Sequence, residues 1–254
     1  MNTSNHTVRT SIALVIVALF LVAVIFLLKR DVQEPVEIPS DGALTETVTV
    51  TDERIVIAKE DALSSISVAY PRLDGFMDAA VEEKINTTIK TEAQSLVDIF
   101  LSNYLEDTPP DALEKNTISS EYQIAGPARG YVTVIMSVSE YASGAAHPNP
   151  YTVVLTFDTT TGDKVTVADF FKSGSAYLDV LSSQSRAMVT ERFGDDGDAE
   201  WIAAGTGPDE LNFQVAYPDT DGFRVVFDAY VVAPYSAGVT EITIPYMALA
   251  SVLK

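Results

Sequence analysis

A long amphipathic stripe in the first half of the chain constrains the fold most. Apolar residues recur every three or four positions, at Met77, Val81, Ile85, Ile89, Ala93, Leu96, Phe100 and Tyr104. This spacing predicts one continuous helix with a single apolar face. The segment Asp107-Thr-Pro-Pro110 ends it, because proline disfavours helical backbone in the residue before it. A stripe of about seven turns needs a sheet to pack against.

The remainder of the chain reads mainly as short strands. Segments that are β-branched or alternate apolar with polar residues occupy 45–59, 63–70, 117–124, 131–141, 151–157, 164–167, 211–217, 223–227 and 239–244. Turn residues such as Asp158 and Gly162 separate several of them and predict hairpins. A second, shorter helix is expected at 176–193. The predicted fold class is α+β, with antiparallel sheet packed by one long and one shorter helix, after an N-terminal transmembrane helix.

Residues 11–28 are uncharged and almost wholly apolar. At about 1.5 Å per residue, such a helix just crosses a hydrocarbon core of ~30 Å. We interpret it as an uncleaved signal anchor, because no small-x-small cleavage site follows Lys29-Arg30. A cleaved signal peptide and a buried helix are the alternatives.

The anchor defines the expected domain organisation. Residues 1–10 are the cytoplasmic tail, 11–28 the membrane span, 29–44 a stalk, and 45–254 an extracytoplasmic domain with possible lobes at 45–140 and 141–254. Large domains translocate largely regardless of charge, so we expect a single-pass protein of the cell membrane with its N-terminus in the cytoplasm.

Charge and cysteine content exclude several functions. All 36 acidic residues follow residue 30, and the whole chain has a formal net charge of −20. This balance argues against nucleic acid as a partner and permits cationic proteins. The chain has no cysteine, which excludes disulfides, lipidated cysteine and thiolate metal sites. An extracytoplasmic domain without disulfides suggests a bacterial protein.

His147 is the one histidine outside the first ten residues, in the segment Ser143-Gly-Ala-Ala-His-Pro-Asn-Pro150. A lone histidine can be a general base, a metal ligand or a structural or ligand-contacting residue. A catalytic triad also needs a positioned nucleophile and an orienting acid, and no G-x-S-x-G segment is present. Small residues before it and prolines around it favour a shaped loop between strands.

Other candidates for chemistry are weaker. Asp195-Asp-Gly-Asp198 and Asp219-Thr-Asp-Gly222 resemble fragments of calcium loops, but neither has the full ligand spacing of an EF-hand. Carboxylate pairs for glycoside hydrolysis cannot be singled out among so many acids. Trp201 is expected in a core or half-buried position. We therefore assign no catalytic residue, no metal site and no cofactor.

The most distinctive loop is Tyr230-Val-Val-Ala-Pro-Tyr-Ser-Ala-Gly238, between two apolar strands. Proline fixes φ, glycine permits the turn, and tyrosine supplies a large ring with a polar tip. This composition suits an exposed aromatic surface. The alternative is that Tyr230, Tyr235 and Tyr246 are buried core, and the solvent exposure of Tyr235 separates the two.

Three groups of residues carry a family resemblance. They are Gly144-x-x-His147-Pro-Asn149; Thr156-Phe-Asp158 with Gly162 and Asp169-Phe-Phe171; and Tyr230-x-x-Ala-Pro-Tyr235-x-x-Gly238 with Ile244-Pro-Tyr246. In this order they resemble the extracytoplasmic domain of RsiV-type membrane proteins and of PdaC-type peptidoglycan deacetylases, catalogued as domain of unknown function 3298. The resemblance covers about residues 45–254 and is strongest from residue 144 onward.

The resemblance implies an α+β domain outside the cell. In RsiV-like members it is a receptor for lysozyme that controls release of a sigma factor; in deacetylase-like members it accompanies a catalytic domain. The tail of residues 1–10 is too short for a sigma factor, and no esterase domain follows, so only the role of the domain is expected to transfer. Ser143 also replaces a glycine that is usual before Ala-His.

We therefore expect a membrane-anchored, non-enzymatic domain that binds a cell-wall-associated protein such as lysozyme, or peptidoglycan. The predicted contact residues are Tyr230, Pro234, Tyr235, Gly238, Gly144, His147 and Asn149. One alternative is a cell-wall hydrolase or esterase that uses His147 or a carboxylate pair. The other is a purely structural surface domain.

Overall fold

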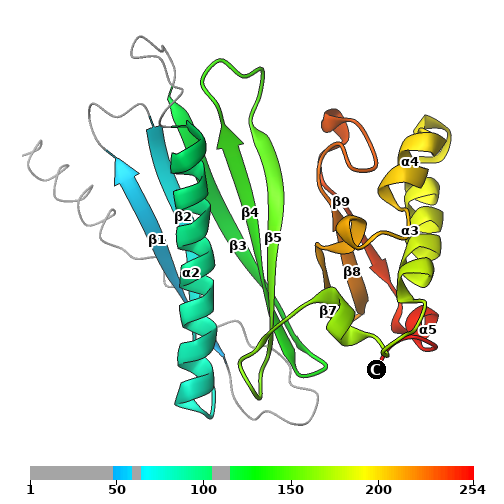
Figure 1. Ribbon diagram of the computed structural model, residues 1–254, viewed down its shortest axis with the longest axis horizontal. Helices are drawn as coiled ribbons and strands as arrows, with labels where there is room; N and C mark the ends of the chain where they lie inside the picture. Colours follow the sequence, from blue (N-terminus) through cyan, green and yellow to red (C-terminus); the bar gives the residue numbers. More distant parts are fainter. Residues whose placement is uncertain (1–47, 59–63, 105–114) are drawn as a thin grey trace, which may run out of the picture. The chain divides into compact units, whose positions relative to one another are not determined.

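The computed structural model describes residues 48–58, 64–104 and 115–254 (Figure 1). All of them belong to one compact unit, residues 35–254. The predicted tail 1–10, membrane span 11–28 and stalk 29–44 lie outside the described residues. Within the described ranges, no helix combines the length and apolarity that crossing a bilayer requires.

A six-stranded sheet occupies the first part of this unit (Figure 1). Its order is β1-β2-β3-β4-β5-β6, with bounds β1 Thr49–Ala58, β2 Ser64–Asp74, β3 Asn116–Ala128, β4 Tyr131–Tyr141, β5 Asn149–Asp158 and β6 Lys164–Val165. The pairs are antiparallel except β2 with β3, which are parallel. The predicted α+β class is confirmed, but the all-antiparallel expectation is wrong at this one pair.

The parallel pair exists because the long helix α2 (Ala79–Tyr104) lies between β2 and β3 in the chain. Parallel neighbours need a crossover connection, and a helix is its usual form. The predicted helix is therefore confirmed, and it crosses the sheet face rather than joining two hairpins (Figure 1).

The buried seam of α2 follows the predicted stripe with two corrections. Met77 precedes the helix and is 75% exposed, so its predicted place on the stripe is wrong. Val97 is fully buried where the prediction used Leu96, which packs only at the margin. The remaining seam packs on apolar side chains of β2 to β5 and forms the first hydrophobic cluster: Val81, Ile85, Ile89, Ala93 and Phe100.

Asn86 is a buried polar residue on this seam, and its side-chain amide is hydrogen-bonded to the backbone of Leu73. The side-chain oxygen accepts from Leu73 N at 2.8 Å, and the side-chain nitrogen donates to Leu73 O at 2.7 Å. A buried amide costs stability unless it is paired in this way. Asn86 therefore fixes the register of α2 against the end of β2.

The second part of the unit is a three-stranded antiparallel sheet covered by helices. It comprises β7 (Ala216–Asp219), β8 (Gly222–Phe227) and β9 (Thr240–Ile244), in that order. Helix α3 (Tyr177–Phe193) is the predicted second helix, and α4 (Ala199–Gly205) and α5 (Tyr246–Leu249) follow. Their apolar faces form a second hydrophobic cluster with Phe223, Val225, Phe227, Ile242 and Ile244.

One segment joins the two sheets, and another differs from the predicted strands. The connection from β6 contains the 3₁₀ turn η1 (Val167–Phe170), whose Phe170 ring meets that of Tyr131 edge-on at 4.8 Å. The predicted strand 211–217 is mostly wrong, because residues Glu210–Phe213 form the 3₁₀ turn η3 and only Ala216 and Tyr217 are extended. The alternation of apolar and polar residues in the sequence did not distinguish a 3₁₀ turn from a strand at this position.

Candidate functional site

Three aromatic rings from two loops meet at the surface, and we call His147, Tyr230 and Tyr235 the aromatic cluster. The imidazole of His147 stacks on the ring of Tyr235 with centroids 3.9 Å apart and planes 24° apart. Its Nε2 lies 3.2 Å from the hydroxyl of Tyr230, a residue 83 positions away. The two tyrosine rings are 5.6 Å apart. The fold therefore joins two of the loops that the sequence singled out.

The histidine loop connects β4 to β5. Ser143 N donates to the side-chain oxygen of Asn116 at 2.7 Å, and Ala145 N donates to Ala142 O at 2.9 Å. Gly144 has φ +83°, a conformation that glycine adopts without strain. The second ring nitrogen, Nδ1, lies 2.8 Å from the carbonyl oxygen of Pro148. These contacts give the imidazole a defined orientation at an exposed position.

The tyrosine loop connects β8 to β9. Val232 and Ala233 are buried, and Val232 packs in the second hydrophobic cluster, which holds the loop against the core. Pro234 precedes the 3₁₀ turn η4 (Tyr235–Ala237), and Gly238 ends it with φ +67°. The hydroxyl of Tyr235 donates to Pro148 O at 3.2 Å, so this loop also contacts the histidine loop directly.

Tyr230 has a backbone conformation that is unusual for its side chain. Its φ is +71°, in the left-handed region that a bulky residue occupies only when its surroundings enforce it. Trp201, on α4, donates from Nε1 to the carbonyl oxygen of Tyr230 at 2.8 Å. The side chain of Tyr230 is 50% exposed. The strained backbone thus directs a large ring outward rather than into the core.

A second link holds the tyrosine loop to the first sheet. Asp228, one residue beyond β8, accepts from Thr152 N at 3.1 Å and from Thr152 Oγ1 at 2.7 Å. Thr152 lies on β5, the same strand that follows the histidine loop. Both loops are therefore positioned from the same strand, which fixes the cluster's geometry.

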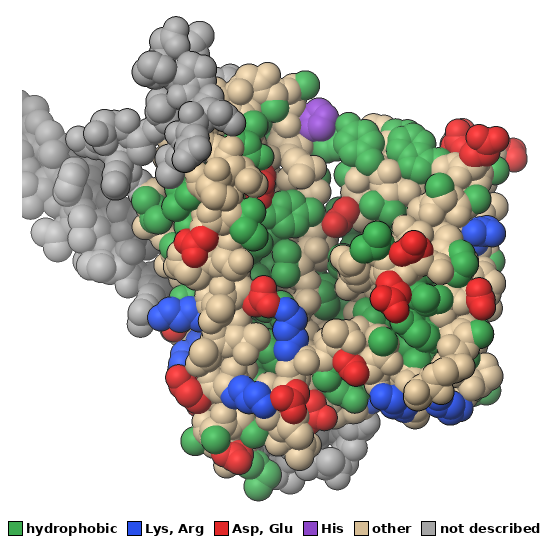
Figure 2. Space-filling view, in the orientation of Figure 1, with side chains coloured by type: hydrophobic (Ala, Val, Ile, Leu, Met, Phe, Trp, Pro, Cys, Tyr) green, Lys and Arg blue, Asp and Glu red, His purple; other side chains and the backbone are tan. Residues whose placement is uncertain are grey.

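Acidic side chains lie beside the cluster. Asp195 and Asp196 lie in the 3₁₀ turn η2 (Gly194–Asp196), Asp198 is the N-cap of α4, and all three are exposed. Trp201, which is hydrogen-bonded to Tyr230, follows Asp198 by three residues. On the face in Figure 2, the histidine, hydrophobic side chains and acidic side chains follow one another along one edge. An aromatic surface with an acidic flank matches cationic molecules.

The seven predicted site residues play different parts. His147, Tyr230 and Tyr235 meet in the cluster, Pro234 and Gly238 bound the turn that carries Tyr235, and Gly144 shapes the histidine loop. Asn149 is exposed at the start of β5, opposite Glu140. Whether these residues bind a partner stays a prediction. Tyr235 is half-buried against His147, so neither the fully exposed nor the core alternative describes it.

Tyr246, which the core alternative also named, has a structural place. Its hydroxyl donates to Asp219 O at 2.6 Å, and the guanidinium of Arg129 lies 5.2 Å from its ring centroid. Burial is the main cause that raises the pKa of Tyr246 to about 12. The sequence reasoning did not identify Trp201, Thr152 or Asp228 as supports, because their contacts form only in the folded chain.

The two segments that resemble calcium loops have other roles. Asp198 caps α4 by accepting from the backbone of Glu200 and Trp201. Asp219 accepts from Thr220 N at 2.8 Å and from Arg224 Nε at 2.8 Å, so its carboxylate orders the turn between β7 and β8. Among the described residues, no three histidine or acidic side chains converge as metal ligands.

Comparison with known proteins finds a family model that matches part of the chain. Residues 168–247 match the family described as "Protein of unknown function (DUF3298)". Crystal structures of DUF3298 family members from Bacteroides fragilis and Pseudomonas aeruginosa share the fold, with TM-scores of 0.58 and 0.59. Their sequence identities are 16% and 14%, and each match covers 84% of this chain and 96% of the other.

Two curated proteins are similar to the chain over longer stretches. The chain is 25% identical to the anti-sigma-V factor RsiV of Bacillus subtilis over 225 residues, which cover 85% of this chain and 74% of RsiV. It is 28% identical over 157 residues to the immunogenic protein MPT64 of Mycobacterium tuberculosis, covering 61% of this chain and 67% of the relative. These matches support the predicted resemblance to an RsiV-like DUF3298 domain, and the family model itself matches residues 168–247.

Proposed function

We propose that this chain is a membrane-anchored, non-enzymatic extracytoplasmic binding domain. Its partner is a wall-associated protein of the lysozyme type or a cell-wall glycan. The observation that carries the proposal is the aromatic cluster, in which three rings from two separate loops meet at the surface. Within it, Tyr230 is 50% exposed and has a strained backbone. Strain of this kind persists where the surroundings enforce it, and it is concentrated at functional sites.

The physical properties of the cluster suit binding. Tyrosine offers a large contact area with few rotatable bonds, and tyrosine is enriched among residues that dominate binding energy. The stacking on His147 and the hydrogen bond from Tyr235 to Pro148 O hold the rings before any partner arrives. A surface ordered in advance loses less conformational entropy on binding.

Charge favours a cationic partner. The chain has a formal net charge of −20, and Asp195, Asp196 and Asp198 lie in the segment that leads to Trp201. Complementary charge speeds association and weakens as salt screens it. The likeness to RsiV, an anti-sigma factor, supports a regulatory or receptor class of protein, and the apolar run 11–28 supports the membrane anchor.

The alternative of a wall hydrolase has less support. The neighbours of the two His147 ring nitrogens are the Pro148 carbonyl and the Tyr230 hydroxyl. A nucleophilic mechanism needs an activated serine, cysteine or threonine at one nitrogen and commonly an acid at the other. A purely structural domain has less support because the ring of Tyr230 is half in solvent.

A direct binding assay tests this function. The full chain in detergent is titrated with lysozyme, and in parallel with purified peptidoglycan, by calorimetry. Lysozyme with acetylated lysines is the matched control, since it carries fewer positive charges. We expect saturable binding to lysozyme or peptidoglycan, with lysozyme binding weakened by acetylation and by salt. Absence of binding to both would contradict the proposal.

A further inference from the structure

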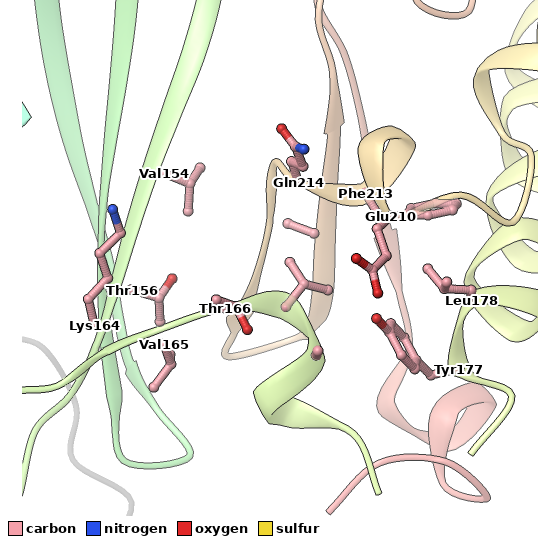
Figure 3. A pocket seen from close by; sticks show the side chains of 13 residues that line it. Val154, Thr156, Lys164, Val165, Thr166, Tyr177, Leu178, Glu210, Phe213 and Gln214 are labelled. Atoms are coloured by element: carbon pink, nitrogen blue, oxygen red, sulfur yellow. The ribbon is translucent and has the colours of Figure 1, made fainter. Parts of the chain in front are cut away.

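A recess of about 480 Å³ lies between the β5–β6 edge of the first sheet and the second part of the unit (Figure 3). None of its lining residues belongs to the aromatic cluster. Its apolar walls come from Val154, Val165, Leu178 and Phe213, and Glu210 lies at one end. Ligand sites in proteins commonly have this size and this mixture of apolar walls and few polar groups.

One wall of the recess is a partly unpaired strand. On the side of β5 away from β4, β6 covers only Thr156 and Phe157, and Thr152 N is taken by Asp228. Alternate residues of a strand direct their backbone groups to the same side. Val154 therefore presents its N–H and C=O on the side of Thr152 and Thr156, where no strand of the described chain pairs with it.

The opposite end of the recess is acidic. The Glu210 carboxylate and the Tyr177 hydroxyl face each other (Figure 3), and burial, followed by the nearby Glu210 charge, raises the pKa of Tyr177. The base among the lining residues, Lys164, forms an ion pair with Glu92 outside the recess. Within the described residues Glu210 forms no ion pair with a base, so its charge is available to a ligand.

We propose that this recess binds an extended peptide that carries a basic side chain. The peptide backbone adds to the edge of β5 by pairing with Val154, as in other strand-addition complexes. A lysine opposite Val154 has its side chain on the same face as Val154, which lines the recess. Its methylene stem packs along Leu178 and Phe213, and its ammonium reaches Glu210. This site goes beyond the proposed function and stands independently of it.

A peptide titration followed by NMR tests the proposal. The isotopically labelled full chain is titrated with the capped pentapeptide threonyl-valyl-lysyl-valyl-threonine. Two matched analogues carry norleucine in place of lysine or a methyl group on the lysine backbone nitrogen. We expect saturable shifts of the Val154 and Val165 amides, affinity about tenfold lower for the norleucine analogue, and loss of binding for the methylated one.

Variants separate this site from the aromatic cluster. Glu210→Gln, at an exposed position, is expected to reduce affinity for the lysine peptide to that of the norleucine analogue and to leave the latter unchanged. Glu200→Gln, a matched change on α4, and Tyr235→Ala leave both affinities unchanged. The proposal is overturned if the lysine peptide shows no saturable binding at millimolar concentration, if Glu210→Gln binds it normally, or if the methylated peptide binds as well as its parent.

Discussion

The imidazole of His147 stacks on the ring of Tyr235 at 3.9 Å, although the two residues belong to different sheet connections. The histidine follows β4, and the tyrosine follows β8. Paired aromatic rings typically contribute about 1 kcal/mol beyond their burial. The contact therefore stabilises the arrangement of two loops as well as forming a surface, and the supports around it can be tested separately.

Trp201 is the first such support. Trp201→Phe keeps an aromatic ring and removes the N–H that donates to Tyr230 O. We expect a loss of about 1 kcal/mol in the free energy of unfolding, because one hydrogen bond is lost. Faster hydrogen exchange of the Val231 amide should accompany it, since the strained backbone of Tyr230 can then relax. Denaturation followed by circular dichroism and exchange by NMR measure the two effects; unchanged exchange would show that Trp201 does not restrain the loop.

The link between Asp228 and Thr152 is the second support. Asp228→Ala leaves Thr152 N without its acceptor, and we expect it to cost roughly 1–2 kcal/mol of unfolding free energy. Thr152→Val removes only the hydroxyl contact and should cost about 1 kcal/mol. Because both act on one interaction, the double variant should be less destabilised than the sum. A double-mutant cycle measured by urea denaturation tests this link. If the two losses of unfolding free energy add fully, Asp228 and Thr152 do not interact directly.

Asp169 predicts a dependence of stability on pH. The backbone N–H and then the hydroxyl of Thr166 donate to its carboxylate and lower its pKa below the ordinary 3.8. A pKa lowered by folding stabilises the protein above the unfolded value, and this contribution is lost as pH falls toward the folded value. Unfolding free energy of Asp169→Asn should therefore fall less steeply than wild type between roughly pH 5 and pH 2.

The Thr166→Val variant is the control for this prediction. It removes the hydroxyl donor and keeps the backbone donor to Asp169. Its slope of stability against pH should lie between those of wild type and Asp169→Asn. Equal slopes for all three proteins would mean that Asp169 does not titrate differently in the folded state.

Helix α2 and most hairpins were predictable because their signals are local. The stripe from Val81 to Phe100 repeats at the helical period, and Asp158 to Gly162 has turn chemistry of its own. The parallel pairing of β2 with β3 was missed, because strand direction depends on where α2 returns the chain. Met77 fits the helical period but precedes the helix, so the periodicity alone placed the start of the apolar stripe too early.

The candidate site was predictable in composition and not in geometry. The sequence indicated that His147, Tyr230 and Tyr235 lie in shaped loops. Their meeting depends on the contact of Asp228 with Thr152 between the two sheets and on the contact of Trp201 with Tyr230, and neither contact has a local signal. The half-burial of Tyr235 follows from the same meeting, because His147 covers one face of its ring.

The most direct test of the proposed binding surface is the affinity of the full chain for lysozyme with and without the ring of Tyr230. Tyr246→Phe is the matched control, since Tyr246 is half-buried and lies outside the cluster. We predict that Tyr230→Ala costs about 2 kcal/mol of binding, roughly thirtyfold in Kd, while Tyr246→Phe leaves Kd unchanged. Equal affinities of wild type and Tyr230→Ala would contradict the account.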